Sequence, residues 1–202
     1  MHFGTPRRRE PSHPRRPPHL TGIPVTDELR YPTGRFVAPD LYTDELRRGW
    51  IGELMALPRL VSTAVAGLDD RQLDTPYRPG GWTVRQVVHH LPDSHLNAYM
   101  RFRLALTEQE PTIRPYYEDR WAELPDARQA PVEVSLALLE ALHARWVTLL
   151  RTIRSDDWLR IFVHPEHGRR MTLNETLAMY AWHGRHHVAH ITTLREREGW
   201  ND

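Results

Sequence analysis

Histidines gather in two short parts of the chain. Four of them lie near the C-terminus at His183, His186, His187 and His190, and three more lie upstream at His89, His90 and His95. Residues four apart on an α-helix project from the same face, so the pairs His183–His187 and His186–His190 could each offer two nitrogens to one ion. A histidine from a second helix would complete a three-ligand site that leaves coordination positions for water or substrate. The spacing therefore predicts a catalytic divalent metal.

The composition limits the chemistry that such a site can use. The chain has 202 residues, 40% hydrophobic and 26% charged, which is typical of one soluble domain. It has no cysteine and all 27 basic residues are arginine, which excludes zinc–thiolate sites, cysteine nucleophiles and Schiff-base lysines. No apolar run is long enough to span a membrane, and the N-terminus lacks the apolar core of a secretory signal. We expect a cytoplasmic protein whose metal is held by nitrogen and oxygen.

The N-terminal segment differs in composition from the rest of the chain. Residues 1–22 are rich in proline and arginine, and this composition predicts a disordered basic tail. An arm that binds nucleic acid is conceivable, but the remaining residues are mildly acidic and contain no nucleic-acid motif. We therefore favour a solvated extension, with residues 23–202 forming one folded domain.

Amphipathic periodicity predicts four helices, over about residues 43–67, 83–107, 132–153 and 171–198. Thr83 or Trp82 lies near the N-cap of the second helix. Residues 108–130 contain three prolines and no strong period, which predicts a long loop between the second and third helices, and His164–Gly168 predicts a turn. No segment has the alternating pattern of a strand. The expected fold is all-α, a four-helix bundle, in which metal sites form between facing helices.

Helical phase ranks the histidines of the helix predicted over 171–198. His187 lies near the centre of the apolar stripe and His183 on its flank, whereas His186 and His190 are rotated toward solvent. Gly184 should allow a neighbouring helix to approach closely.

In the helix predicted over 83–107, His95 lies near the apolar stripe, His90 lies on one flank and His89 points away. Phase alone cannot choose between His90 and His95. One of them could instead be a hydrogen-bonded core histidine.

Further polar residues of the same helix are candidates for supporting roles. Asp93 is one turn from His90 and could orient its imidazole, or could pair with a surface arginine. Asn97 and Arg101 lie on the same strip as His90, where they could contact an anionic substrate or form a solvated flank. Possible pocket walls or proton donors are Tyr99, Tyr116 and Tyr117.

Four blocks of the sequence carry a family resemblance: Leu73–His90, Asp93–His95, Ile113–Pro115 and Trp182–Ile191. They closely resemble the YfiT family of candidate metal-dependent hydrolases. That family belongs to the DinB-like superfamily of four-helix bundles, which also includes bacillithiol S-transferases and mycothiol-dependent enzymes. The resemblance extends from about Tyr31 to Trp200 and leaves only the tail outside.

The resemblance implies one divalent ion per chain, zinc or nickel, held by His90, His183 and His187. It selects His90 where phase left two alternatives, and it implies a homodimer. The implied activity is that of a hydrolase that activates water to attack a small-molecule substrate. The alternative is an S-transferase that joins a low-molecular-weight thiol such as bacillithiol to an electrophile.

A non-catalytic metal-binding bundle and a DNA-associated bundle are less favoured. We expect no membrane or nucleic-acid partner, and the residues identify no catalytic acid or base.

Overall fold

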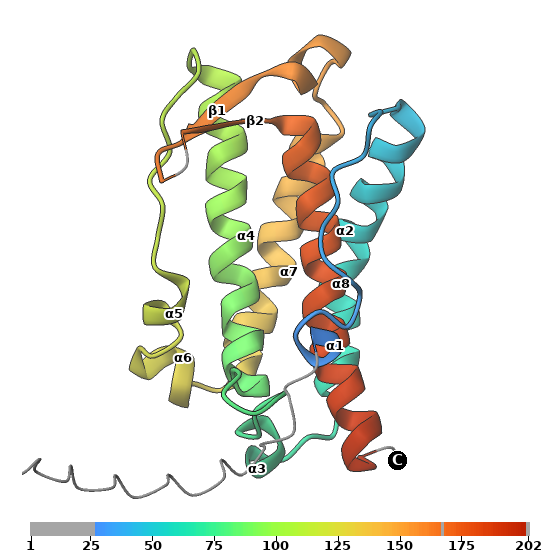
Figure 1. Ribbon diagram of the computed structural model, residues 1–202, viewed down its shortest axis with the longest axis vertical. Coiled ribbons are helices and arrows are strands. Elements are labelled where there is room, and N and C mark those ends of the chain that lie inside the picture. The colour runs from blue at the N-terminus through green and yellow to red at the C-terminus, as the bar shows by residue number, and fades with distance from the viewer. Residues whose placement is uncertain (1–26, 167, 201–202) are drawn as a thin grey trace, which may run out of the picture.

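The computed structural model describes residues 27–166 and 168–200, and within them four long helices run along the molecule (Figure 1). These helices are α2 (Asp44–Val65), α4 (Val84–Thr107), α7 (Val132–Leu150) and α8 (Leu173–Glu198). The all-α, four-helix-bundle prediction is confirmed, and each predicted helix boundary lies within three residues of the observed one. The predicted tail, residues 1–22, lies outside the described residues.

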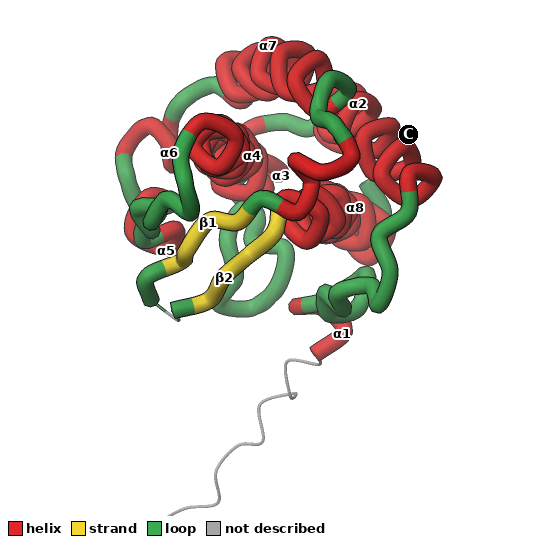
Figure 2. The backbone as a smooth tube through the Cα atoms, turned by 90° about the horizontal axis from the view of Figure 1, so that it is seen from above, coloured by secondary structure: helices red, strands yellow, loops and turns green. Residues whose placement is uncertain are grey.

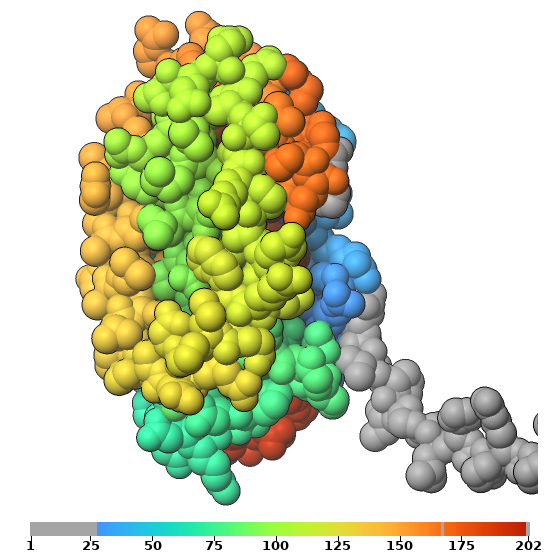
Figure 3. Space-filling model, turned by 90° about the vertical axis from the view of Figure 1, so that its left-hand side faces the viewer, coloured from blue at the N-terminus to red at the C-terminus, as the bar shows by residue number. Residues whose placement is uncertain are grey.

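The four helices form a ring in the order α2, α7, α4 and α8, which is visible in the view along the bundle (Figure 2). Helices α4 and α7 are neighbours that run in the same direction (Figure 1). The chain must therefore return along the whole bundle between them, and residues 108–131 make this crossover over the outside of α4 (Figure 3). The predicted long loop is confirmed as a connection, but it contains the short helices α5 (Glu118–Trp121) and α6 (Pro125–Gln129).

A β-hairpin at one end of the bundle is a feature that the sequence patterns did not predict. Strands β1 (Ile161–His164) and β2 (Arg169–Thr172) pair antiparallel, with the predicted turn between them. Four-residue strands are too short to show clear alternation, and this hairpin is also held from outside. Val163 exchanges backbone hydrogen bonds with the crossover, donating to the carbonyl of Pro111 at 2.9 Å and accepting from Ile113 at 3.0 Å.

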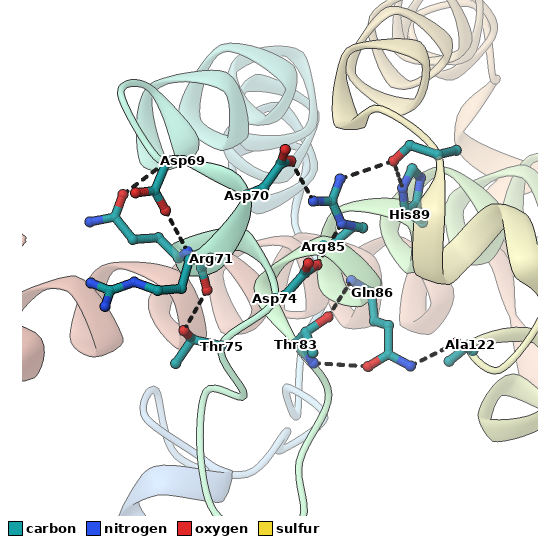
Figure 4. Close-up of polar contacts among 12 residues, drawn as sticks. Asp69, Asp70, Arg71, Asp74, Thr75, Thr83, Arg85, Gln86, His89 and Ala122 are labelled. Carbon is teal, nitrogen blue, oxygen red and sulfur yellow. Dashed lines mark hydrogen bonds and ion pairs between the residues drawn. The ribbon is translucent and has the colours of Figure 1, made fainter.

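Threonine caps begin three of the long helices. Thr43, Thr83 and Thr172 each accept a hydrogen bond from the backbone N–H three residues ahead, at 3.2, 3.1 and 3.1 Å. Around Thr83 the cap is a reciprocal box with Gln86, whose amide also donates to the carbonyl of Ala122 in the crossover at 2.7 Å (Figure 4). The start of α4, and with it the position of His90, is therefore fixed both locally and by the crossover.

Three further short elements complete the chain: α1 (Asp27–Arg30), α3 (Asp70–Leu73) and the 3-10 helix η1 (Ser155–Leu159). None of the described helices is both long enough and apolar enough to cross a membrane.

The apolar core is divided into two clusters. One cluster contains Phe102, Trp146 and Phe162, and the other contains Leu91 and Ile191. On α4 and α8 the sequence positions between the two clusters carry buried histidines, and the buried His143 of α7 contacts His95, so a polar layer crosses the middle of the bundle.

Helices α2 and α8 approach closely beside this layer, as predicted from Gly184. A Cβ added to Gly184 would lie 2.7 Å from Cδ2 of the buried Leu57 on α2, so a larger residue there would force the Leu57 side chain out of its present position.

Candidate metal centre

Three histidine nitrogens converge between α4 and α8. Nε2 of His183 lies 3.2 Å from Nε2 of His90 and 3.1 Å from Nε2 of His187. One potential ligand atom from each of the three rings falls within 4.8 Å of the other two, and no other group of three potential ligands with this closeness occurs within the described residues. The cluster lines a cavity of about 290 Å³.

The donor set of this cluster fits a divalent cation. A tetrahedral ion with Zn–N bonds of about 2.05 Å places its nitrogen ligands about 3.3 Å apart, close to both observed separations. Hydrogen bonds alone cannot satisfy this arrangement, because the in-plane site of His183 Nε2 can serve one partner and two nitrogens approach it. A cation at the centre would satisfy all three nitrogens at once.

Burial keeps the three rings in the neutral form that a metal requires. Burial, and next the charge of His186, lowers the pKa of His90 to about 3. For His183 and His187 burial is again the largest cause, followed by repulsion from neighbouring histidines, and both pKa values lie well below the ordinary value of 6.5. At neutral pH no proton has to be displaced from the lone pairs that face the cluster.

A chain of two further histidines lies behind His183. His143 Nδ1 lies 2.5 Å from the carbonyl oxygen of Leu54, His143 Nε2 lies 3.0 Å from His95 Nδ1, and His95 Nε2 lies 3.1 Å from His183 Nδ1. A carbonyl oxygen only accepts, so the proton of neutral His143 must be on Nδ1. Each following ring must then donate through Nδ1 and accept through Nε2, which leaves His183 Nε2 unprotonated and directed at the cluster.

This histidine chain fixes the tautomer of one candidate ligand. Hydrogen-bond partners of this kind orient a ligating imidazole and raise its basicity. For His187 the corresponding atom, Nδ1, is buried without a partner within the described residues, so only His183 is known to be held in this way. Sequence reasoning missed His143 altogether, although its place between Leu139 and Trp146 on the buried face of α7 was a usable signal.

Replacing His95 or His143 by leucine should weaken metal binding without abolishing it. We expect about 10- to 100-fold lower affinity, because His183 loses the partner that holds its tautomer. The measurement is zinc competition against a chromophoric chelator, combined with long-range ¹H–¹⁵N NMR of the metal-free protein, which should show His183 protonated at Nδ1.

His190→Leu is the matched control, because His190 is equally buried and makes no contact with His183 Nδ1. Wild-type affinity in both the His95 and the His143 variants would contradict the role of the chain.

The structure corrects the predicted exposure of three histidines. His89, expected to point away, is buried between α4 and α7, where Nδ1 lies 2.7 Å from Oγ of Ser135 and Nε2 lies 3.1 Å from the carbonyl of Ala130 (Figure 4). His186 and His190, expected to face solvent, are only 7% and 2% exposed.

The covering of His186 and His190 comes from distant parts of the chain. The ring of His186 packs against Tyr31 at a centroid distance of 5.8 Å, and the ring of His190 stacks on Tyr77 at 3.8 Å. This face of α8 points away from the other three long helices. It is nevertheless buried, because residues before α2 and after α3 pack against it.

The other candidates on α4 differ in position. Asp93 makes no hydrogen bond with His90 in the described part of the chain, and burial followed by repulsion from Asp126 raises its pKa to about 6. Asn97 donates to the carbonyl of Asp93 at 2.9 Å and so binds its own helix. Arg101 is buried and lines a second cavity of about 470 Å³, which also contacts His183.

Of the three tyrosines suggested as pocket walls, Tyr116 and Tyr117 line the second cavity. Tyr99 does not. Its hydroxyl accepts a hydrogen bond from Arg103 at 2.9 Å.

Comparison with known proteins places the chain in a family. A sequence model of the DinB superfamily matches residues 53–191, which include every histidine of the central layer. The chain belongs to the DinB superfamily. A protein of Bacillus cereus (strain 03BB102) named "Putative metal-dependent hydrolase" is 55% identical over 174 residues, which cover 86% of this chain and 99% of that protein. A Bacillus mycoides (strain KBAB4) protein of the same description is 54% identical over 173 residues, with the same coverage.

A solved structure agrees with the fold. YfiT from Bacillus subtilis, described as a probable metal-dependent hydrolase with an unusual four-helix bundle topology, is 49% identical and superposes with a TM-score of 0.85. The match covers 86% of this chain and 99% of YfiT. The resemblance inferred from the sequence blocks is therefore confirmed.

Proposed function

We propose that His90, His183 and His187 hold one divalent ion, zinc or nickel, and that the protein is a hydrolase acting on a small molecule. The observation that carries this proposal is the convergence of three Nε2 atoms on the wall of a cavity, with that of His183 3.2 Å from His90 and 3.1 Å from His187; the rings of His90 and His187 are buried and that of His183 is partly buried. The names of the similar Bacillus proteins support it. A divalent ion bound by three neutral imidazoles keeps its full charge, so it would acidify a water or thiol and polarise a substrate carbonyl.

The chain's own residues supply orientation and a candidate proton acceptor. Trp82 packs against the ring of His90 at a centroid distance of 4.6 Å and limits the access of water from that side. Glu118 lines both cavities. Part of its side chain is exposed, but partial desolvation of the carboxyl on the cavity wall, followed by repulsion from Asp119 and Glu166, raises its pKa. A carboxylate with a raised pKa beside the cluster is suited to accept a proton and return it to a leaving group.

The experiment is a panel assay with and without metal. The protein, freed of metal and then loaded with zinc or nickel, is incubated with esters, with amides, and with a low-molecular-weight thiol plus an electrophile. Hydrolysis that disappears on chelation and returns with metal would establish the hydrolase. Turnover confined to the mixture of thiol and electrophile would contradict the hydrolase proposal and support an S-transferase. This alternative is compatible with the lack of cysteine in the chain, because the sulfur would arrive with the cosubstrate.

A metal-loaded protein that turns over neither class would support a non-catalytic bundle. Homodimerisation and a cytoplasmic location stay predictions, and light scattering of the purified protein would test the former.

A further inference from the structure

Two buried arginines of α4 have very different surroundings. Arg85, 6% exposed, is fully engaged: its guanidinium donates to Asp70 at 2.8 Å, to Asp74 at 2.7 Å and to the carbonyl of Ala130 at 3.1 Å (Figure 4). Arg101 is 9% exposed, yet among residues 27–166 and 168–200 no hydrogen bond or ion pair engages its guanidinium, and its Nε is fully buried without a partner.

An unpaired guanidinium is costly inside a protein. The group stays charged at any working pH, and buried charges are normally paired because desolvation disfavours them strongly. Arg85 shows how this fold satisfies a buried arginine that serves structure. No residue within 27–166 and 168–200 supplies the missing partner of Arg101, so a bound ligand is expected to supply it.

The cavity around Arg101 has the chemistry to bind an anion. Its volume is about 470 Å³, within the range of small-molecule sites, and its wall includes Ser94, Tyr116 and Tyr180. Burial is the largest cause that raises the pKa values of both Tyr116 and Tyr180, so both hydroxyls stay protonated and can donate. A guanidinium beside neutral hydroxyl donors is a common arrangement for binding a carboxylate.

The carboxylates near the cavity mouth do not neutralise Arg101. Glu118, Asp119 and Glu166 lie on the cavity wall, but none of them forms an ion pair with Arg101 within the described residues. An ion pair would lower the pKa of Glu118, whereas burial and the two neighbouring carboxylates raise it.

The cavity also adjoins the histidine cluster. His183 lines both this cavity and the smaller one that contains His90 and His187. One small molecule could therefore contact Arg101 at one end and reach the cluster with the other.

We infer that Arg101 binds a carboxylate group of the substrate and so selects small organic acids for the reaction at the histidine cluster. This inference rests on the proposed function for the reaction, but the binding of the carboxylate does not depend on turnover. Arg101 acts here as a specificity determinant.

The first test measures carboxylate binding to metal-free protein, so that no ion can capture the probe. Benzoate should bind the wild-type chain more tightly than its neutral analogue benzamide, and Arg101→Met should weaken benzoate binding at least ~10-fold by calorimetry or ligand-observed NMR, since a charge-assisted pair is lost. Arg103→Met is the matched control, two residues along α4 and exposed, and should bind benzoate as the wild type does. Equal benzoate affinity in wild type and Arg101→Met would overturn the inference.

Thermal unfolding without ligand separates this role from a structural one. Removal of an unpaired buried charge should raise the Tm of Arg101→Met by a few degrees, whereas Arg85→Met should lower the Tm because it leaves Asp70 and Asp74 without their partner. A Tm of Arg101→Met that falls as far as that of Arg85→Met would show a structural arginine and overturn the inference.

The last test uses a matched pair of esters on the metal-loaded protein, mono-4-nitrophenyl glutarate and 4-nitrophenyl butyrate. Arg101→Met should raise KM for the charged ester at least ~10-fold and leave the neutral ester unchanged. Hydrolysis of both esters with no dependence on Arg101 would overturn the inference about Arg101 but support the proposed hydrolase activity. Arg101-dependent benzoate binding with no hydrolysis of either ester would keep the inference and contradict the hydrolase.

Discussion

Replacing His187 by alanine is expected to abolish metal binding at micromolar free zinc and to lower any metal-dependent turnover by at least ~10²-fold. Structural zinc sites bind with about 10 kcal/mol or more, so one of three protein ligands contributes roughly 3 kcal/mol, or about two orders of magnitude in affinity. The same loss is expected for His90→Ala, and His183→Ala should be at least as severe because it also breaks the histidine chain behind the site. Elemental analysis after dialysis against buffered zinc gives the bound metal per chain.

His190→Ala is the matched control for this series. His190 lies on the same helix and is buried to a similar degree, but its Nε2 bonds the carbonyl of Arg30 at 3.1 Å rather than facing the cluster. It should retain about one metal ion per chain. Zinc should raise the Tm of the wild type and of His190→Ala, but not that of the three ligand variants, since only a ligand that binds the folded state stabilises it. Full zinc occupancy in His90→Ala would refute the ligand assignment.

The metal-free protein is expected to unfold on mild acidification, near pH 5. Burial is the largest cause that lowers the pKa values of eight histidines; it lowers those of His90 and His190 to about 3, and those of His143 and His186 to about 4. The other four are His89, His95, His183 and His187. In the unfolded chain these groups titrate near 6.5, so between pH 6.5 and about 4 unfolding takes up protons.

Proton uptake on unfolding makes the free energy of unfolding depend on pH. Stability is unaffected by these groups above pH 6.5 and falls below it by about 1.36 kcal/mol per pH unit for each histidine that stays neutral in the folded state. Even four such groups would remove about 5 kcal/mol per unit, which is comparable with the total stability of a domain. The raised pKa of Asp93 opposes this loss by at most about one proton.

Urea unfolding at several pH values between 7.5 and 5.5 would measure the effect. The slope of the free energy of unfolding against pH should correspond to at least about four protons taken up, and saturating zinc should move the acid midpoint to lower pH. The double variant His95→Leu/His143→Leu is a direct control, because it should reduce the slope by about two protons. A free energy of unfolding that does not change over this pH range would contradict the buried, neutral histidine layer.

The local features of the chain could be predicted well from its sequence. Apolar periodicity predicts the four long helices, one of the two residues expected near the second N-cap, Thr83, is the cap, and Gly184 is a point of close helix approach as predicted. The residue types and the i, i+4 spacing also indicated His183 and His187, two of the three histidines that the structure brings together, but left His90 and His95 open as the third. These features depend on contacts within one helix or on the direction of a side chain about one helix axis, which the sequence specifies directly.

Helical phase could not predict which neighbouring segments of the chain cover each face of a helix. His186 and His190 are outward on α8 but are buried by Tyr31 and Tyr77, and His89 is buried because α7 lies against that side of α4. The hairpin likewise depends on its bonds to the crossover. Burial is set by all the elements around a residue, and their arrangement is not encoded in the period of any one helix.

The distinction is sharpest at the candidate site. The sequence alone determined that two helices carry metal-binding residue types at a suitable spacing, and that cysteine and lysine chemistry are absent. Helical phase left His90 and His95 as alternatives, and the family resemblance selected His90 without a physical reason. The tertiary structure supplies that reason, because Nε2 of His90 faces the cluster whereas His95 hydrogen-bonds the back of His183. It alone also showed that Arg101 is buried with no partner in the part of the chain that the structure describes, whereas Arg85 has three partners there, two of them carboxylates.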